Sequence, residues 1–107
     1  MIVLRGYEIL VMQSNADLAS DETKKASKGT LYLTNTRLVF ETESGTILSD
    51  TLLDRIRSVE SVTDHEFAVS YNADRTDKTS RDIYIILDQN MHKKWMNAFK
   101  NVLDARS

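Results

Sequence analysis

The polar stretch LASDETKKASKG (residues 18–29) holds the residues best suited to ligand chemistry. Its three lysines are Lys24, Lys25 and Lys28. Ammonium groups make charge-assisted hydrogen bonds to phosphate, and Arg37 is a fourth basic candidate for the same ligand-binding site. Acidic residues in or beside the stretch would repel an anion: Asp17, Asp21 and Glu22. We therefore favour a solvated loop of balanced charge, with an anion site as the competing hypothesis.

The sequence contains no arrangement of side chains that predicts catalysis. Asp74 and Asp77 lie in a polar loop, without a His or Ser that the pattern would place beside them. His65 falls in a predicted turn and His92 on the polar side of a predicted helix, so no metal site with enough ligands is expected. Three glycines form neither a phosphate cradle nor a nucleophile elbow. We expect no enzyme, no metal and no cofactor.

Composition limits the remaining classes of protein. The 107 residues suffice for one domain, residues 1–107, with a single core. A net charge of -2 disfavours nucleic acid, because a nucleic-acid binder needs excess Lys and Arg to displace counterions from phosphates. The chain lacks cysteine, which excludes disulfides and fits a reducing cytoplasm. No apolar run approaches the roughly 20 residues of a membrane-spanning helix.

The segment GTLYLTNTRLVF (residues 29–40) predicts a β-hairpin. Leu31 and Leu33 share one face of the first strand, and Leu38 and Phe40 alternate with polar or smaller residues in the second. Asn35 tolerates a positive φ, so the intervening TNTR forms a tight turn. The two strands are expected to place their apolar sides on one core.

Other segments with a period of two predict further strands. They are residues 7–12, 46–53, 66–71 and 82–88, with polar loops at 18–29 and 72–80. In the last strand, the alternation is expected to turn Ile83, Ile85 and Leu87 towards the core.

The segment SDTLLDRIRSVESV (residues 49–62) fits two structures. Its apolar residues have helical spacing, and Ser49 or Asp50 could cap a helix. Two short strands with a bend near Asp54 explain the same residues. We favour strands, because Ile56, Val59 and Val62 are β-branched.

The C-terminal residues, about 90–105, predict one amphipathic helix. Its apolar stripe includes Trp95 and Phe99, and Asp88 or Asn90 can cap its first turn. A sheet of about seven strands must curl to hide its apolar face, and the helix would close the open end. The basic side of the helix, with Lys93 and Lys94, is expected to face solvent. The predicted core comprises Leu31, Leu33, Leu38, Phe40, Ile83, Ile85, Trp95 and Phe99.

The hairpin at residues 29–40 resembles the signature of GRAM domains and related PH-like modules. LLDRIRSVE (residues 52–60) resembles a second motif of these domains, and the closing helix with an inward Trp fits their plan. GLUE domains and bacterial PH-like domains share the hairpin. The resemblance implies a mainly β fold: a seven-stranded antiparallel, partly open barrel or sandwich capped by one C-terminal helix.

The resemblance also implies a non-catalytic binding or adaptor module in intracellular trafficking or signalling. Such a module would be cytoplasmic, or peripheral at a membrane, and would bind proteins or lipid head groups. Phosphoinositide-binding members carry Lys at the end of the first strand, whereas this chain reads LVMQSN there. A protein or peptide partner is therefore favoured over an anionic phospholipid, with residues 46–53 as a candidate strand edge. The alternative is a small self-assembling structural module.

Overall fold

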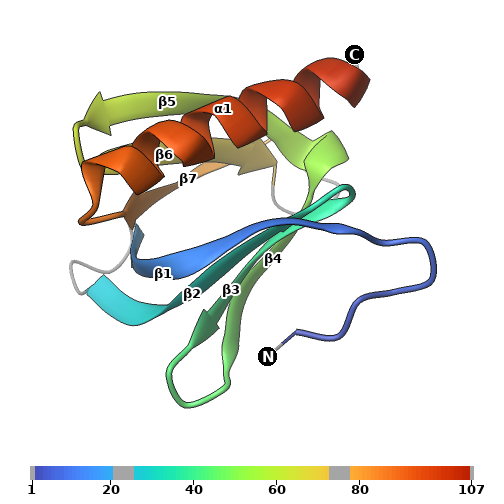
Figure 1. The fold of residues 1–107 in the computed structure, drawn as a ribbon, viewed down its shortest axis with the longest axis horizontal. Coiled ribbons are helices and arrows are strands. Elements are labelled where there is room, and N and C mark those ends of the chain that lie inside the picture. Colours follow the sequence, from blue (N-terminus) through green and yellow to red (C-terminus); the bar gives the residue numbers. More distant parts are fainter. Residues whose placement is uncertain (1, 21–25, 73–77, 107) are drawn as a thin grey trace.

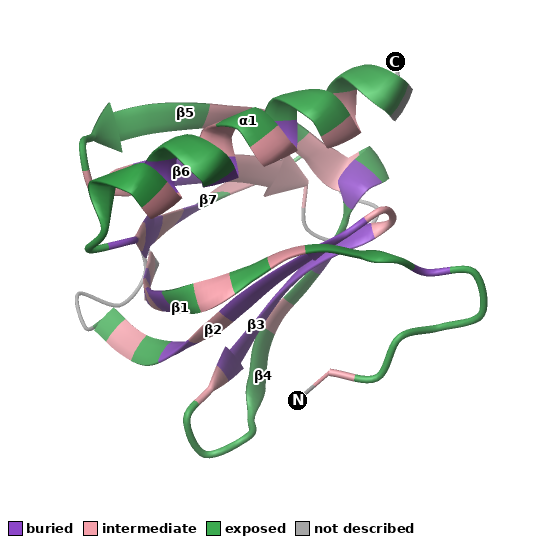
Figure 2. Cartoon of the chain, viewed as in Figure 1, coloured by how far each residue is buried: buried purple, intermediate pink, exposed green. Residues whose placement is uncertain are grey.

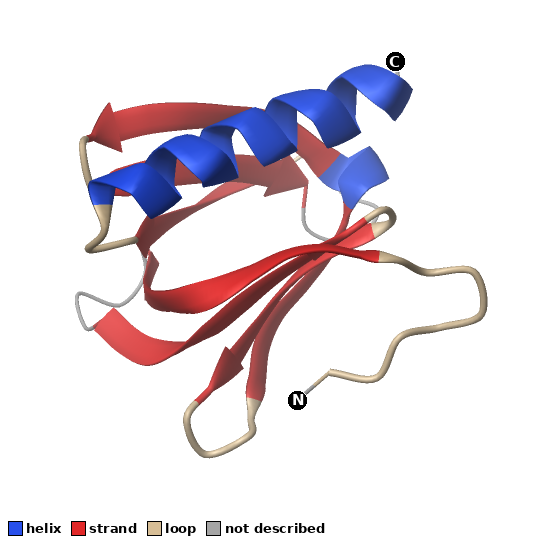
Figure 3. Ribbon diagram, viewed as in Figure 1, coloured by secondary structure: helices blue, strands red, loops and turns tan. Residues whose placement is uncertain are grey.

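Seven antiparallel strands form one unclosed sheet, and one α-helix follows them, over the residues that the computed structural model describes, 2–20, 26–72 and 78–106 (Figures 1 and 3). The strand order is β4-β3-β2-β1-β7-β6-β5, so β4 and β5 are the two sheet edges. The elements are β1 (Leu10–Ser20), β2 (Ala26–Thr34), β3 (Arg37–Thr42), β4 (Ile47–Leu52), a 3₁₀ turn (Leu53–Arg55), β5 (Ile56–Thr63), β6 (Glu66–Asn72), β7 (Thr79–Ile85) and α1 (Gln89–Arg106). This architecture confirms the predicted mainly β fold class.

The sheet curls because β1 belongs to both of its halves. β1 pairs with β2 from Leu10 to Ala19, but with β7 only from Asp17 to Ser20. The two halves therefore diverge along the first part of β1, and α1 packs against β1 and β5 across the resulting opening (Figure 1).

The predicted hairpin is present as β2 and β3. Leu31 lies opposite Phe40, and Leu33 lies opposite Leu38, so all four side chains share the inner face. Strands also proved correct for the ambiguous segment, residues 49–62. The bend predicted near Asp54 is the 3₁₀ turn Leu53–Arg55, which carries the chain from β4 to β5.

The first strand and its loop were wrongly placed. The predicted strand at residues 7–12 is instead β1, which starts at Leu10 and continues to Ser20. Most of the predicted loop at 18–29 belongs to strands, because β2 already begins at Ala26. The alternation of apolar residues that predicts a strand is weak in this part of β1. Ser14, Ala16 and Leu18 face the core, but Ser14 is polar and Ala16 is very small.

The inward face of β7 differs from the prediction by one residue. Tyr84 and Ile86 are buried, whereas Ile83 and Ile85 are half-buried and Leu87 is 80% exposed. Register explains the difference, because Tyr84 lies opposite the inward residues Leu18 and Phe67. The segment IYII is apolar at every position, so its own period could not select a face.

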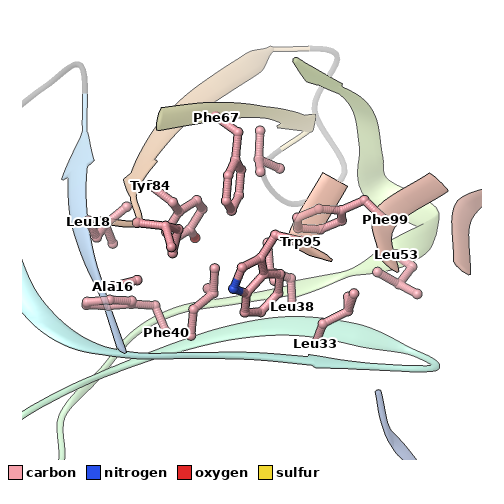
Figure 4. Close-up of a cluster of buried hydrophobic side chains, with 13 residues drawn as sticks. Ala16, Leu18, Leu33, Leu38, Phe40, Leu53, Phe67, Tyr84, Trp95 and Phe99 are labelled. Carbon is pink, nitrogen blue, oxygen red and sulfur yellow. The ribbon is translucent and has the colours of Figure 1, made fainter. Parts of the chain in front are cut away.

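Aromatic rings of the sheet and the helix meet in the core (Figure 4). Trp95 and Phe99 of α1 are 0% and 1% exposed. Ring centroids of Phe67 and Phe99 lie 5.4 Å apart, and those of Trp95 and Phe99 lie 5.7 Å apart. The other buried members of the predicted core are Leu31, Leu33, Leu38 and Phe40.

The helix begins with a side-chain cap and holds one residue that was wrongly placed. Asp88 Oδ1 accepts hydrogen bonds from the backbone N–H groups of Asn90 at 2.9 Å and Met91 at 3.4 Å. His92 was expected on the exposed polar side, but it is buried with Nε2 3.1 Å from the Glu66 carbonyl oxygen. The His92 ring also lies beside Phe67 of β6, with ring centroids 6.1 Å apart, so contacts with β6 bury it.

Gly29 is required by close backbone approach. A Cβ at this position would collide with the Glu41 carbonyl oxygen and lie 2.9 Å from the Phe40 ring. We expect Gly29→Ala to lower the free energy of unfolding by about 1–3 kcal/mol, as overpacking does. Urea unfolding followed by circular dichroism measures the loss. Gly6→Ala is the control, because a Cβ there meets no atom within 4 Å; an equal loss in both variants would refute the steric explanation.

Candidate functional site

The basic residues predicted to bind an anion do not form one site within the described residues. Lys24 and Lys25 lie outside the part of the chain that the structure describes. Lys28 is exposed on β2, directly opposite Asp17 of β1. Arg37, at the start of β3, is buried.

Arg37, which was predicted as a ligand residue, is engaged in an internal network. Its Nε donates to Glu8 Oε2 at 2.8 Å, and its Nη2 donates to Glu8 Oε1 at 3.1 Å. Nη1 donates to Asp50 Oδ2 at 2.9 Å, and Nη2 also donates to the Val3 carbonyl oxygen at 2.9 Å. A guanidinium whose three nitrogens all bond protein oxygens offers little to a ligand.

The carboxylate of Glu8 is the centre of this network. Besides the bonds from Arg37, it accepts hydrogen bonds from the hydroxyl groups of Thr34 and Thr36, both at 2.7 Å. The Arg37 hydrogen bonds, with those from the threonines, hold the pKa of Glu8 far below its usual value despite burial, which acts in the opposite direction. Glu8 is the only charged residue in YEILVM, and that isolated charge was the sequence signal for an internal partner.

The network fixes the N-terminal segment, residues 2–9, beside the outer face of β3 and β4. Arg5 Nη2 lies 3.7 Å from Asp50 Oδ2. At the β2–β3 turn, the Ile9 N–H donates to Asn35 Oδ1 at 2.8 Å, and the Asn35 N–H donates to the Ile9 carbonyl at 3.0 Å. The segment is therefore held near its start by contacts of Val3 and Arg5 with Arg37 and Asp50, and at its end by the hydrogen bonds of Ile9.

Exposed apolar side chains concentrate on this segment and on the adjacent edge strand. Of the eleven exposed large hydrophobic residues among those described, seven lie there and two more lie at the start of β1, and Figure 2 shows these stretches of the ribbon as largely exposed. We call this set the β4 edge surface: Val3, Leu4, Tyr7, Ile9, Leu10, Val11, Ile47, Leu48 and Leu52. Tyr7 is 100% exposed, and the whole of β4 except Ser49 and Thr51 is exposed. The surface thus combines apolar contact area with a strand edge.

The β4 edge surface offers backbone hydrogen-bonding groups to a partner strand. Within the described residues, β4 pairs only with β3, so its other side presents unpaired backbone N–H and C=O groups. No group of three or more His, Cys, Asp or Glu side chains in the described ranges is placed to hold a metal. No helix among the described residues has the length and apolar character needed to cross a membrane.

Solved structures share this architecture at low sequence identity. The Ran binding domain of the nuclear complex component Nup2 from Ashbya gossypii has a TM-score of 0.74 and 14% identity, over 95% of this chain and 100% of that chain. The Slm1-PH domain, described with ligand binding in a non-canonical site, has a TM-score of 0.69 and 13% identity over 88% and 97%. The Vps36 N-terminal PH domain has a TM-score of 0.65 and 14% identity over 95% and 86%. This chain has a PH-like fold.

The PH-like fold agrees with the fold that the sequence resemblance implies. A further solved structure holds the Slm1-PH domain in complex with inositol-4-phosphate, with a TM-score of 0.65 and 14% identity over 88% of this chain and 93% of that chain. No protein-family model and no curated protein matches the chain. The resemblance to GRAM domains in particular therefore stays a prediction.

Proposed function

We propose that this PH-like chain is a non-catalytic adaptor that binds a protein partner through the β4 edge surface. The concentration of nine exposed large apolar side chains on residues 3–11 and β4 supports this role. Exposed apolar patches on soluble domains mark interaction sites, and an open strand edge can add a strand from a partner. The apolar side chains would supply contact area and the backbone would supply hydrogen bonds.

A protein partner is better supported than a lipid head group. Slm1-PH has been solved with inositol-4-phosphate, so a PH-like fold can hold such a ligand. In this chain, however, the guanidinium of Arg37 is committed to Glu8 and Asp50, and Lys28 faces Asp17 across the strand pair. The hairpin of residues 29–40 supports a GRAM-type assignment, and with it a cytoplasmic role in trafficking or signalling at a membrane periphery.

The proposal is tested with two variants that change the edge surface without disturbing the core. Leu48→Arg and Leu52→Arg place a charge on side chains that are 49% and 42% exposed. Val62→Arg on β5 is the matched control, because Val62 is 45% exposed on the opposite sheet edge. Partner capture from the native lysate, quantified by mass spectrometry, should fall about tenfold for each β4 variant and remain unchanged for the control, since burying an unpaired charge costs over 1.4 kcal/mol.

Two further measurements separate the alternatives. Light scattering over a concentration series detects self-assembly, and a dimer that Leu48→Arg dissociates would replace the adaptor by an assembling module. Sedimentation with vesicles containing anionic phospholipid detects lipid binding, and loss of that binding in Lys28→Glu would replace the protein partner by a membrane. Equal capture by the wild type and both β4 variants would refute the proposed surface.

A further inference from the structure

A cleft lies at the point where β1 and β7 diverge. Its walls are residues 14–17 of β1, residues 85–88, which run from the end of β7 towards α1, and Met91 of α1, and its volume is about 340 Å³. This volume falls at the lower end of the range for ligand pockets, which suits a side chain or a short segment. We call it the fork cleft. It lies away from β4, on the side of the sheet where β1 and β7 pair.

The fork cleft meets the edge of β1 rather than one of its faces. Side chains alternate between the two faces of a strand, so four consecutive residues line one cavity only where it touches the strand's edge. Pairing with β7 starts at Asp17, and residues 14–16 have no described strand on that side. Beyond Ile85 the chain leaves the sheet and continues into α1, so the position beside residues 14–16 is open. An extended peptide could bind there as a strand antiparallel to β1.

The walls of the cleft combine apolar surface with negative charge. Ile85, Leu87 and Met91 supply the apolar part, and Leu87 is 80% exposed. Two acidic residues, Asp17 and Asp88, are also among the residues that line the cavity. Asp17 makes no ion pair with any described residue, and Asp88 uses one oxygen, Oδ1, to cap α1.

Neighbouring charges strengthen the negative character of the cleft on one side. Ile85 lies opposite Asp17 on β1 and opposite Glu66 on β6, so carboxylates flank this residue on both sides. Lys28, opposite Asp17 on β2, is the nearest opposing charge on the paired strand. A long cationic side chain matches these walls, because its methylene stem can cover Ile85 and Leu87 while its head reaches a carboxylate.

We propose that the fork cleft binds an extended peptide segment through one Arg or Lys side chain. The peptide backbone pairs with the free edge of β1 at residues 14–16, and the cationic head bonds the carboxylates of Asp17 and Asp88. This inference rests on the proposed role in protein binding but not on the β4 edge surface. It adds a second site and names the chemistry of its ligand.

The test uses three nine-residue peptides of alternating Ser and Val, whose central residue is Arg, Gln or Glu. Binding is followed by ¹H–¹⁵N chemical shifts and by fluorescence anisotropy, with peptide up to about 2 mM to detect weak complexes. The Arg peptide should move the amide signals of residues 14–17 and 85–88, and should bind about three- to tenfold more tightly than the Gln peptide. The Glu peptide should not bind there.

Variants of the walls define the contacts. Asp17→Asn should weaken binding of the Arg peptide about three- to tenfold, and Asp88→Asn should weaken it similarly while keeping the helix cap, because Asn also caps helices. Leu87→Ala should weaken it about threefold, and its exposed position keeps the fold unchanged. Lys28→Gln is the control and should leave binding equal or tighter.

Several results would overturn the proposal. The first is that the amide signals of residues 14–17 do not move when the Arg peptide is added. The second is that the Arg and Glu peptides bind with equal affinity. The third is that Lys28→Gln weakens binding of the Arg peptide while Asp17→Asn does not. Concentration-dependent shifts at these amides without peptide would assign the cleft to a second copy of the chain. Leu48→Arg should not change peptide affinity, so failure at the fork cleft is distinguishable from failure of the β4 edge surface.

Discussion

Glu8→Gln is expected to lower the free energy of unfolding at pH 7 by about 3 kcal/mol. Removing one partner of a buried ion pair typically costs about 3–5 kcal/mol, because the remaining charge loses its compensation. The lower value applies here because Asp50 still contacts Arg37 and a single segment covers the network. The loss should also release residues 2–9 from β3, since Glu8 accepts bonds from Thr34, Thr36 and Arg37.

The same substitution should change the response to acid. The pKa of Glu8 is lowered in the folded state mainly by the Arg37 hydrogen bonds, while in the unfolded chain it is about 4.3. The stabilisation is therefore complete above about pH 4.3 and is lost as the pH falls below it, because the unfolded chain takes up the proton first. Wild-type stability should fall by up to about 1.4 kcal/mol per pH unit from this residue alone, and Glu8→Gln should lack that contribution.

Urea unfolding followed by circular dichroism between about pH 2.5 and 7 tests both expectations. Glu43→Gln is the matched control, because Glu43 is exposed in the β3–β4 turn and its change should cost less than about 0.5 kcal/mol. In a double-mutant cycle with Arg37→Met, the double variant should lose less stability than the sum of the single variants. Parallel acid slopes for the wild type and Glu8→Gln would show that the network does not stabilise the fold.

Local pattern was enough to predict the elements whose apolar residues mark one face. The β2–β3 hairpin and helix α1 each carry a period that a few neighbouring residues define. At residues 49–62 the spacing was helical, and the β-branched residues indicated the strands on either side of the bend at Leu53–Arg55. The local pattern failed where contacts with other strands decide which side chains face the core. β7 is apolar on both faces, and the register with β1 and β6 selects Tyr84 for the core.

The candidate sites were less predictable because their parts are distant in the sequence. Arg37 was assigned to an anion on its charge alone, and its partner Glu8 lies 29 residues earlier. The strand predicted at residues 7–12 ended before residues 14–17, so the prediction missed the strand edge that lines the fork cleft. Only residues 46–53, chosen as a candidate strand edge, fell at an actual edge of the sheet as β4.

Trp95→Ala should lower the free energy of unfolding by about 3–5 kcal/mol, the range for deleting a large buried aromatic side chain. Trp95 is 0% exposed, packs on Phe67 and Phe99, and donates from Nε1 to Ser14 Oγ at 2.7 Å. Its loss would leave a cavity between α1 and the inner face of the sheet, where Figure 4 shows the ring. Urea unfolding followed by circular dichroism is the measurement, because this is the only Trp and the variant has no indole fluorescence.

Two milder variants separate packing from hydrogen bonding at this position. Trp95→Phe keeps a ring and removes the N–H donor, whereas Ser14→Ala keeps the indole and removes its acceptor. If packing dominates, Ser14→Ala should cost about 1–2 kcal/mol and Trp95→Phe should cost less than Trp95→Ala. A cost below about 1 kcal/mol for Trp95→Ala would mean that the helix does not close the open end of the sheet, because a side chain that fills the core cannot be removed so cheaply.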